Sequence, residues 1–226
     1  MLLLTFVPLA SGQEEHRPEF KMPCQEALKL GLEKFMDVYG EKTQDYSTFG
    51  QKQAFGYWAD CKQVANDALA VKSLTNDKRQ QVSAVREEFN KFGSSLWDLR
   101  YMEEGGGTMW GLISVGAYAE RENFMETFVK TLAMPDRKSP RARRNVNASL
   151  SRIQRWLASG DRKPYTDGSE PEDVAQRQQG YREAIKEAQD ILAKLRDLLG
   201  TLPDEAAARL ASAMASETKN ALADAP

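Results

Sequence analysis

Apolar residues recur at steps of three and four along almost the whole chain after residue 24, and this spacing most constrains the fold. Such steps place side chains on one face of an α-helix, whereas a half-buried strand would alternate with period two. No convincing alternating stretch is present. The sequence therefore predicts an all-α fold, which we interpret as an N-terminal four-helix unit over residues 22–133 and a C-terminal three-helix appendage over residues 141–222.

Gly, Pro and capping residues divide this pattern into separate helices. Gly40 is a stop signal, and Pro140 is pre-set for the first turn of a new helix. The apolar residues between 174 and 199 step by sevens, fours and threes, which predicts a coiled-coil-like hairpin with the Ala-rich last helix. The expected helices span about residues 24–39, 46–71, 75 or 76 to 104, 108–133, 171–199 and 203–221, and a further helix begins at Pro140 and carries apolar steps from Val146 to Leu157.

The chain begins with a short apolar run at residues 2–10 (LLLTFVPLA). A bilayer span needs about 20 apolar residues, so this run is too short to cross a membrane. Ala10 and Gly12 suit the small positions before a signal-peptidase cut, with cleavage before Gln13. No Lys or Arg precedes the run, and the alternative is an N-terminal strand or helix turn buried in the fold. We interpret residues 1–12 as a signal peptide and expect a periplasmic or secreted protein.

Export would give a specific meaning to the two cysteines. In an oxidising compartment, an even pair without metal partners indicates a disulfide, here Cys24–Cys61. The midpoint of this pair falls in a polar turn at residues 40–45, so an antiparallel hairpin would bring the sulfurs to one level. In the cytosol the two residues would instead be buried thiols.

Composition excludes several classes of function. With 1 His and 2 Cys, the chain lacks the ligands of a zinc site that needs three or four such residues. A Ser-His-Asp or Cys-His enzyme would need His16 as its base, and His16 lies in a polar leader. The formal charge of −2 argues against a surface that seeks nucleic acid throughout. We expect neither a metal nor a cofactor.

The most unusual string is residues 101–111, which contains three successive glycines between aromatic residues. One interpretation is a tight helix-to-helix turn. Backbone N–H groups there could also hold an anion, but a P-loop Lys is missing and two Glu would repel phosphate. The functional interpretation is an exposed recognition loop, since Tyr and Trp are enriched in binding hot spots. The candidate binding loop comprises Tyr101, Glu103, Glu104, Gly105, Gly106, Gly107, Thr108 and Trp110.

Carboxylates near this string allow a third interpretation, a cell-wall glycosidase. Glu103 or Glu104 would be the acid, with Asp98 or Glu120 as its partner. Most Glu pairs on helices are solvated surface residues, and we therefore expect no enzymatic activity.

Positive charge gathers in residues 136–163, which carry a net +7 while the rest of the chain carries −9. Such a block could seat the protein on an anionic envelope surface, such as phospholipid headgroups or wall polymer. Alternatively it is a solvated helix face whose charges pair with the acidic remainder of the molecule. The candidate basic surface comprises Arg141, Arg143, Arg144, Arg152 and Arg155.

Residues 22–133 resemble the LprI-type lysozyme-inhibitor-like domains, a family of small exported helical domains. The resemblance rests on an aromatic-rich helix at residues 85–98, a Gly-Gly-Gly-Thr turn at residues 105–108, and a following helix with Arg121 near its middle. Phe89 stands where the family has Trp. The resemblance implies export, a helical fold and, as in some members, binding and inhibition of lysozyme.

These observations lead to one main hypothesis and two rivals. The main hypothesis is an exported helical binding protein of the cell envelope, whose Gly-rich loop contacts a lysozyme or another wall-degrading enzyme. The first rival is an envelope structural or adaptor protein that uses the C-terminal hairpin and the basic segment. The second rival is the glycosidase. We expect no specific nucleic-acid partner and no transmembrane span.

Overall fold

The computed structural model describes residues 20, 22–105, 110–159, 162–167 and 170–222, and every regular element among them is an α-helix. The all-α prediction is therefore confirmed. The expected leader at residues 1–12 lies outside the described residues. The helices are α1 (Cys24–Leu30), α2 (Leu32–Thr43), α3 (Thr48–Ser73), α4 (Asn76–Glu104), α5 (Trp110–Leu132), α6 (Pro140–Leu157), α7 (Pro171–Thr201) and α8 (Asp204–Leu222).

Local capping chemistry explains the starts of α3 and α6. The Ser47 hydroxyl accepts the N–H of Gly50 at the start of α3, and the Ser139 hydroxyl accepts the N–H of Ala142 at the start of α6. The single helix expected over residues 24–39 is in fact two. Gly31 adopts φ 76°, a left-handed backbone angle at which α1 ends and α2 begins at an angle to it.

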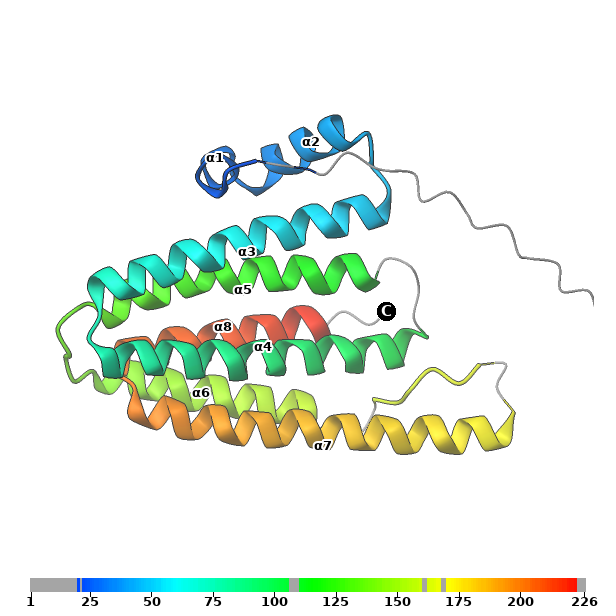
Figure 1. The fold of residues 1–226 in the computed structure, drawn as a ribbon. Coiled ribbons are helices and arrows are strands. Elements are labelled where there is room, and N and C mark those ends of the chain that lie inside the picture. The colour runs from blue at the N-terminus through cyan, green and yellow to red at the C-terminus, as the bar shows by residue number, and fades with distance from the viewer. Residues whose placement is uncertain (1–19, 21, 106–109, 160–161, 168–169, 223–226) are drawn as a thin grey trace, which may run out of the picture.

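Figure 1 shows the long helices stacked in layers. Helices α1 and α2 cover the outer side of α3, which packs along α5. Helices α4 and α8 form the next layer, and α6 and α7 lie beyond them. A non-helical segment that includes residues 162–167, here called the strap, joins α6 to the far end of α7 (Figure 1).

The two units expected from the sequence share one hydrophobic core. Its buried side chains come from the end of α3 and from every helix from α4 to α8, so the chain does not divide near residue 140. Nor do α7 and α8 form the expected hairpin, because α7 packs mainly along α4, and α8 mainly along α6. The apolar stripes of α7 and α8 were correctly located, but each packs mainly on a helix that is not its neighbour in sequence.

A second, smaller core fastens α1 and α2 to α3. Phe35 and Trp58 are buried in it, and Ala119 of α5 closes its inner side. The sulfur atoms of Cys24 in α1 and Cys61 in α3 form a disulfide with Cα atoms 5.0 Å apart, as the sequence predicts. This bond cross-links α1 to the middle of α3.

Two successive residues of α5 carry charge into the interior. The Glu122 side chain is fully buried, accepts a hydrogen bond from Asn66 of α3 at 3.1 Å, and lies 3.1 Å from the guanidinium Nε of Arg86 in α4. Arg121 pairs with Glu217 of α8 and donates to Asn90 of α4 at 2.9 Å. Helix α5 is thereby tied by polar bonds to three other helices.

Another carboxylate of α5, that of Glu126, makes the stability of the fold depend on pH in the acid range. Glu126 bonds with Lys130 and with Lys62 of α3, and these two hydrogen bonds, aided by the ammonium charges, lower its pKa to about 2. A carboxyl whose pKa is lower in the folded state stabilises the fold above its unfolded pKa, and this contribution is lost as the pH falls toward 2.

We expect Glu126→Gln to lose less stability than the wild type on acidification from pH 5 to pH 2. Acid-dependent denaturant unfolding, followed by circular dichroism, measures this difference. Glu87→Gln gives the smaller effect of an exposed pair for comparison, because the bond with Lys91 of the same helix lowers the Glu87 pKa without joining two helices. Parallel pH profiles for the wild type and Glu126→Gln would contradict the expectation.

Candidate binding surface

The C-terminal end of α4 positions the described part of the candidate binding loop. Gly105 caps the helix at φ 77°, and its N–H donates to the carbonyl of Tyr101. A Cβ atom on Gly105 would lie 2.6 Å from the ring of Tyr165, so glycine is required both by the backbone angle and by the strap that crosses it. Gly106, Gly107, Thr108 and the side chain of Trp110 lie outside the described residues.

The Glu103 side chain points into the protein, where Arg162 of the strap neutralises its negative charge. The Arg162 guanidinium binds the Glu103 carboxylate through two nitrogen atoms, at 2.8 and 2.5 Å, and the Tyr181 hydroxyl donates to the same carboxylate. Arg162 also donates to the carbonyl of Leu222 at 2.9 Å. Burial, together with the bond to Glu103, raises the pKa of Tyr181. Glu103 therefore joins α4, the strap, α7 and the end of α8.

This position changes the role expected for the two Glu residues of the loop. The Glu103 side chain is only 8% exposed and is paired. Glu104 is more accessible but forms an ion pair with Arg100 one turn earlier. Neither carboxylate is free to meet a basic partner, because each already has a cation of this chain beside it.

A pocket of about 270 Å³ opens beside Gly105, between α4, the strap and α7. Two aromatic side chains stand exposed around it, Tyr101 at 50% and Tyr165 at 42%. We call this feature the tyrosine pocket; it is lined by Tyr101, Met102, Gly105, Pro164, Tyr165, Arg177 and Gly180.

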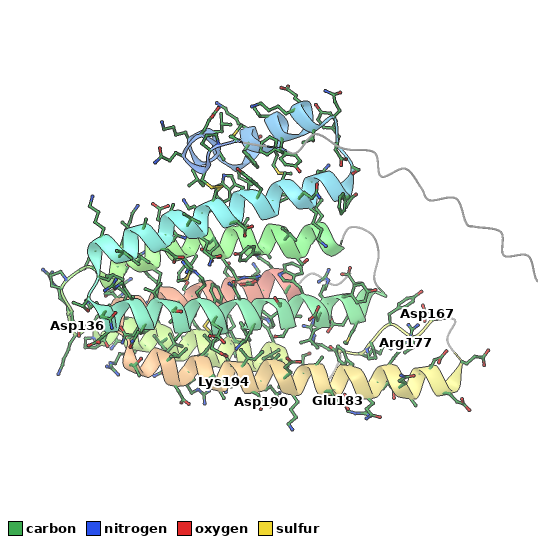
Figure 2. The ribbon with its side chains drawn as sticks, in the orientation of Figure 1. Asp136, Asp167, Arg177, Glu183, Asp190 and Lys194 are labelled. Atoms are coloured by element: carbon green, nitrogen blue, oxygen red, sulfur yellow. A yellow bond between two sulfur atoms is a disulfide. The ribbon has the colours of Figure 1, made fainter. Side chains whose placement is uncertain are left out.

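Backbone hydrogen bonds hold the tyrosine pocket in shape. The N–H of Tyr165 donates to the carbonyl of Met102 at 2.8 Å, and Arg177 donates to the carbonyl of Tyr165 at 3.2 Å. In Figure 2, Arg177 of α7 lies close to Asp167 of the strap. With the Glu103–Arg162 pair behind it, the strap is fixed at several points. The tyrosines are consequently presented on a preformed surface rather than on a loose turn.

Sequence reasoning located Tyr101 and Gly105 but missed Tyr165, Arg162 and Arg177. They lie about sixty to seventy residues further along the chain, and nothing in their local pattern points to residue 101. The available signal was the long break between two strongly periodic helices, which included an aromatic residue. A break of that length that keeps its own contacts is more often functional than a short connection is.

The residues proposed for a glycosidase do not face one another. Asp98 lies toward Glu187 of α7, and partial burial together with the Glu187 charge raises its pKa. Glu120 belongs to α5 and lines a pocket together with Ser216 and Asn220 of α8. Glu103 is bound by Arg162. Asp98 and Glu120 thus lie toward different helices, α7 and α8 respectively.

The five arginines of the candidate basic surface all lie on α6 and are exposed. Arg143 is paired, with its Nε atom 2.8 Å from a carboxylate oxygen of Asp204 in α8. The other four form no ion pair or hydrogen bond with any described residue. We call them the arginine stripe: Arg141, Arg144, Arg152 and Arg155.

Within the part of the chain that the structure describes, no group of three or more His, Cys, Asp or Glu side chains could hold a metal ion. Among the described helices, none combines the length and apolar character that a bilayer span requires. Comparison with protein-family models, curated proteins and solved structures found no match to this chain.

Proposed function

We propose that this chain is an exported, disulfide-bonded helical binding protein of the cell envelope, which acts by contact rather than by catalysis. The observation that carries the proposal is the tyrosine pocket, in which two half-exposed tyrosines and an arginine surround a preformed hollow. Tyr and Arg are the residue types that dominate binding energy at protein interfaces. Export is supported by the Cys24–Cys61 disulfide, since such bonds persist in oxidising compartments.

The partner that we propose is a lysozyme or another wall-degrading enzyme, in keeping with the resemblance of residues 22–133 to lysozyme-inhibitor-like domains. The chemistry of the contact differs from a purely acidic one, because Glu103 and Glu104 are already paired. Tyrosine rings would supply apolar area, and their hydroxyl groups would supply hydrogen bonds to the sugar-binding cleft of the enzyme. Blocking that cleft requires no catalytic group on this chain.

We expect the purified protein at micromolar concentration to slow lysozyme turnover on cell walls, and Tyr101→Ala and Tyr165→Ala to weaken this inhibition. Truncation of a hot-spot residue costs about 2 kcal/mol or more, which corresponds to about a thirtyfold loss of affinity. Pull-down and turnover assays measure the two effects.

Val71→Ala is the matched control, because Val71 is 64% exposed on α3, at the opposite end of the bundle from the tyrosine pocket (Figure 1). It should inhibit as the wild type does. Unchanged lysozyme turnover with the wild-type protein would reject lysozyme as the partner. Equal inhibition by the tyrosine variants would reject the tyrosine pocket as the contact surface.

A further inference from the structure

The arginine stripe has a regular geometry that the bundle itself does not require. Residues 141, 144, 152 and 155 are separated by three, eight and three positions, which places all four on one face of a helix with 3.6 residues per turn. With a rise of 1.5 Å per residue, they extend over about 21 Å. The opposite face of α6 is buried in the core through Ala142, Leu150, Ile153 and Leu157.

These four charges stand uncompensated in a chain that is otherwise acidic. Some other cations of the chain are paired, such as Lys91 with Glu87 and Arg86 with Asp67. The outer side of α7 mixes signs, with Glu183, Asp190 and Lys194 along it (Figure 2). Helix α8, along which α6 packs, adds exposed Arg209 and Lys219 against one exposed carboxylate, Glu205. The exposed side chains of α6 and α8 together therefore carry a net positive charge.

The shape of the region indicates an extended anionic partner rather than a small one. The four guanidinium groups project from the outer face of a single straight helix, so they can meet a flat surface together. The described part of α6 has no large exposed apolar side chain that could anchor it in hydrocarbon. Contact would thus be electrostatic and limited to headgroups, and salt should reverse it.

We propose that the arginine stripe docks the protein on an anionic phospholipid surface. The proposal is independent of the tyrosine pocket, which lies at the end of α4 and leaves the outer face of α6 free. Docking in this way would hold the protein at a membrane without a spanning helix. Each arginine at such a surface contributes about a fivefold gain in partitioning.

The test is cosedimentation of the full chain with vesicles of phosphatidylcholine alone or mixed in equal parts with phosphatidylglycerol. We expect binding only to the mixed vesicles, and release on addition of salt. Replacing all four arginines of the stripe with Gln should reduce partitioning by about two to three orders of magnitude. The matched control replaces Lys29, Lys34, Lys52 and Lys72 with Gln, which removes the same charge from exposed positions on α1–α3. This control should retain most of the binding.

Three results would overturn the proposal. One is equal binding to vesicles with and without phosphatidylglycerol. The second is an equal loss of vesicle binding in the stripe variant and in the lysine control, which would show that binding depends only on the net charge of the protein. The third is tighter binding to soluble polyphosphate or duplex DNA than to mixed vesicles at equal phosphate concentration, which would assign the stripe to a polymer.

Lysozyme inhibition by the stripe variant, measured in parallel, should remain at the wild-type level. Failure of the vesicle-docking proposal is therefore distinguishable from failure of the tyrosine pocket as the contact surface.

Discussion

Replacing Cys24 and Cys61 together with Ser is expected to lower the free energy of unfolding by about 4 kcal/mol. The bond closes a loop with a sequence separation of 37 residues, and the chain-entropy relation gives about 4 kcal/mol for a loop of that length. The loss should be local at first. Helices α1 and α2 rest on their own small core, so without the bond they can detach from α3 while the larger core stays closed.

Hydrogen exchange distinguishes this local opening from general weakening, and two further measurements test the contribution of the bond itself. Denaturant unfolding of the double Ser variant gives the change in free energy. Hydrogen exchange should accelerate in α1 and α2 and change little in α4, α7 and α8. Adding reductant should destabilise the wild type and leave the double Ser variant unaffected. If the mass of the native protein does not increase by two hydrogen atoms on reduction, the disulfide is absent and the argument for export loses its support.

The helices themselves were predictable because the signals that define them are local. The start of a new helix expected at Pro140 coincides with the start of α6, where the Ser139 side chain caps the helix. The break at Gly31 was missed because the apolar stripe continues across it from Leu28 to Phe35. The spacing of apolar residues indicates which of them share a face. A glycine within this spacing can turn the chain without changing the spacing itself.

The packing partners were not predictable in the same way. An apolar stripe indicates that a helix has a buried face, but it does not identify the helix that covers this face. The stripe of α7, with Tyr181, Leu192 and Leu199, would suit an antiparallel hairpin with α8, yet it packs on α4. The candidate site depends on these pairings. The tyrosine pocket exists because α7 lies beside α4 and the strap crosses between them, and no local pattern contains that information.

The buried charged residues were the least predictable part of the fold, because Arg and Glu are residue types normally found on the surface. Arg121 and Glu122 look like ordinary surface residues of an amphipathic helix, yet both are buried. Gly93 of α4 supplies the room for one of them. A Cβ atom there would lie 2.1 Å from a guanidinium nitrogen of Arg121 and 2.5 Å from a carboxylate oxygen of Glu217. The Arg121–Glu217 pair occupies the space that a side chain at position 93 would need.

Glu217→Leu is expected to destabilise the protein by about 3–5 kcal/mol, the range for removing one partner of a buried ion pair. The Arg121 side chain is 5% exposed and stays charged at any accessible pH, so its loss of a partner cannot be relieved. The cost should therefore be nearly the same at pH 5 and pH 8. Urea unfolding at the two pH values measures it.

Arg121→Met should behave differently, because the stranded group is then a carboxyl that can take up a proton. Burial already raises the pKa of Glu217 in the wild type, against the opposing effect of Arg121. Without Arg121 the folded-state pKa rises further, and a carboxyl with a raised pKa loses folding stability as the pH increases above its unfolded value. Arg121→Met should thus be less destabilised at pH 5 than at pH 8. Equal stability loss at both pH values would contradict this account.

The double variant Arg121→Met/Glu217→Leu separates the value of the pair from the penalty of breaking it. Buried ion pairs replaced by apolar residues of similar volume are often neutral or stabilising, so the double variant should be more stable than either single one. The same background tests Gly93. In the wild type, Gly93→Ala pushes a methyl group into the paired side chains, whereas in the double variant a flexible Met and Leu can yield. If Gly93→Ala costs as much in the double variant as in the wild type, glycine is required there by the packing of α4 itself. The ion pair would then have adapted to that packing.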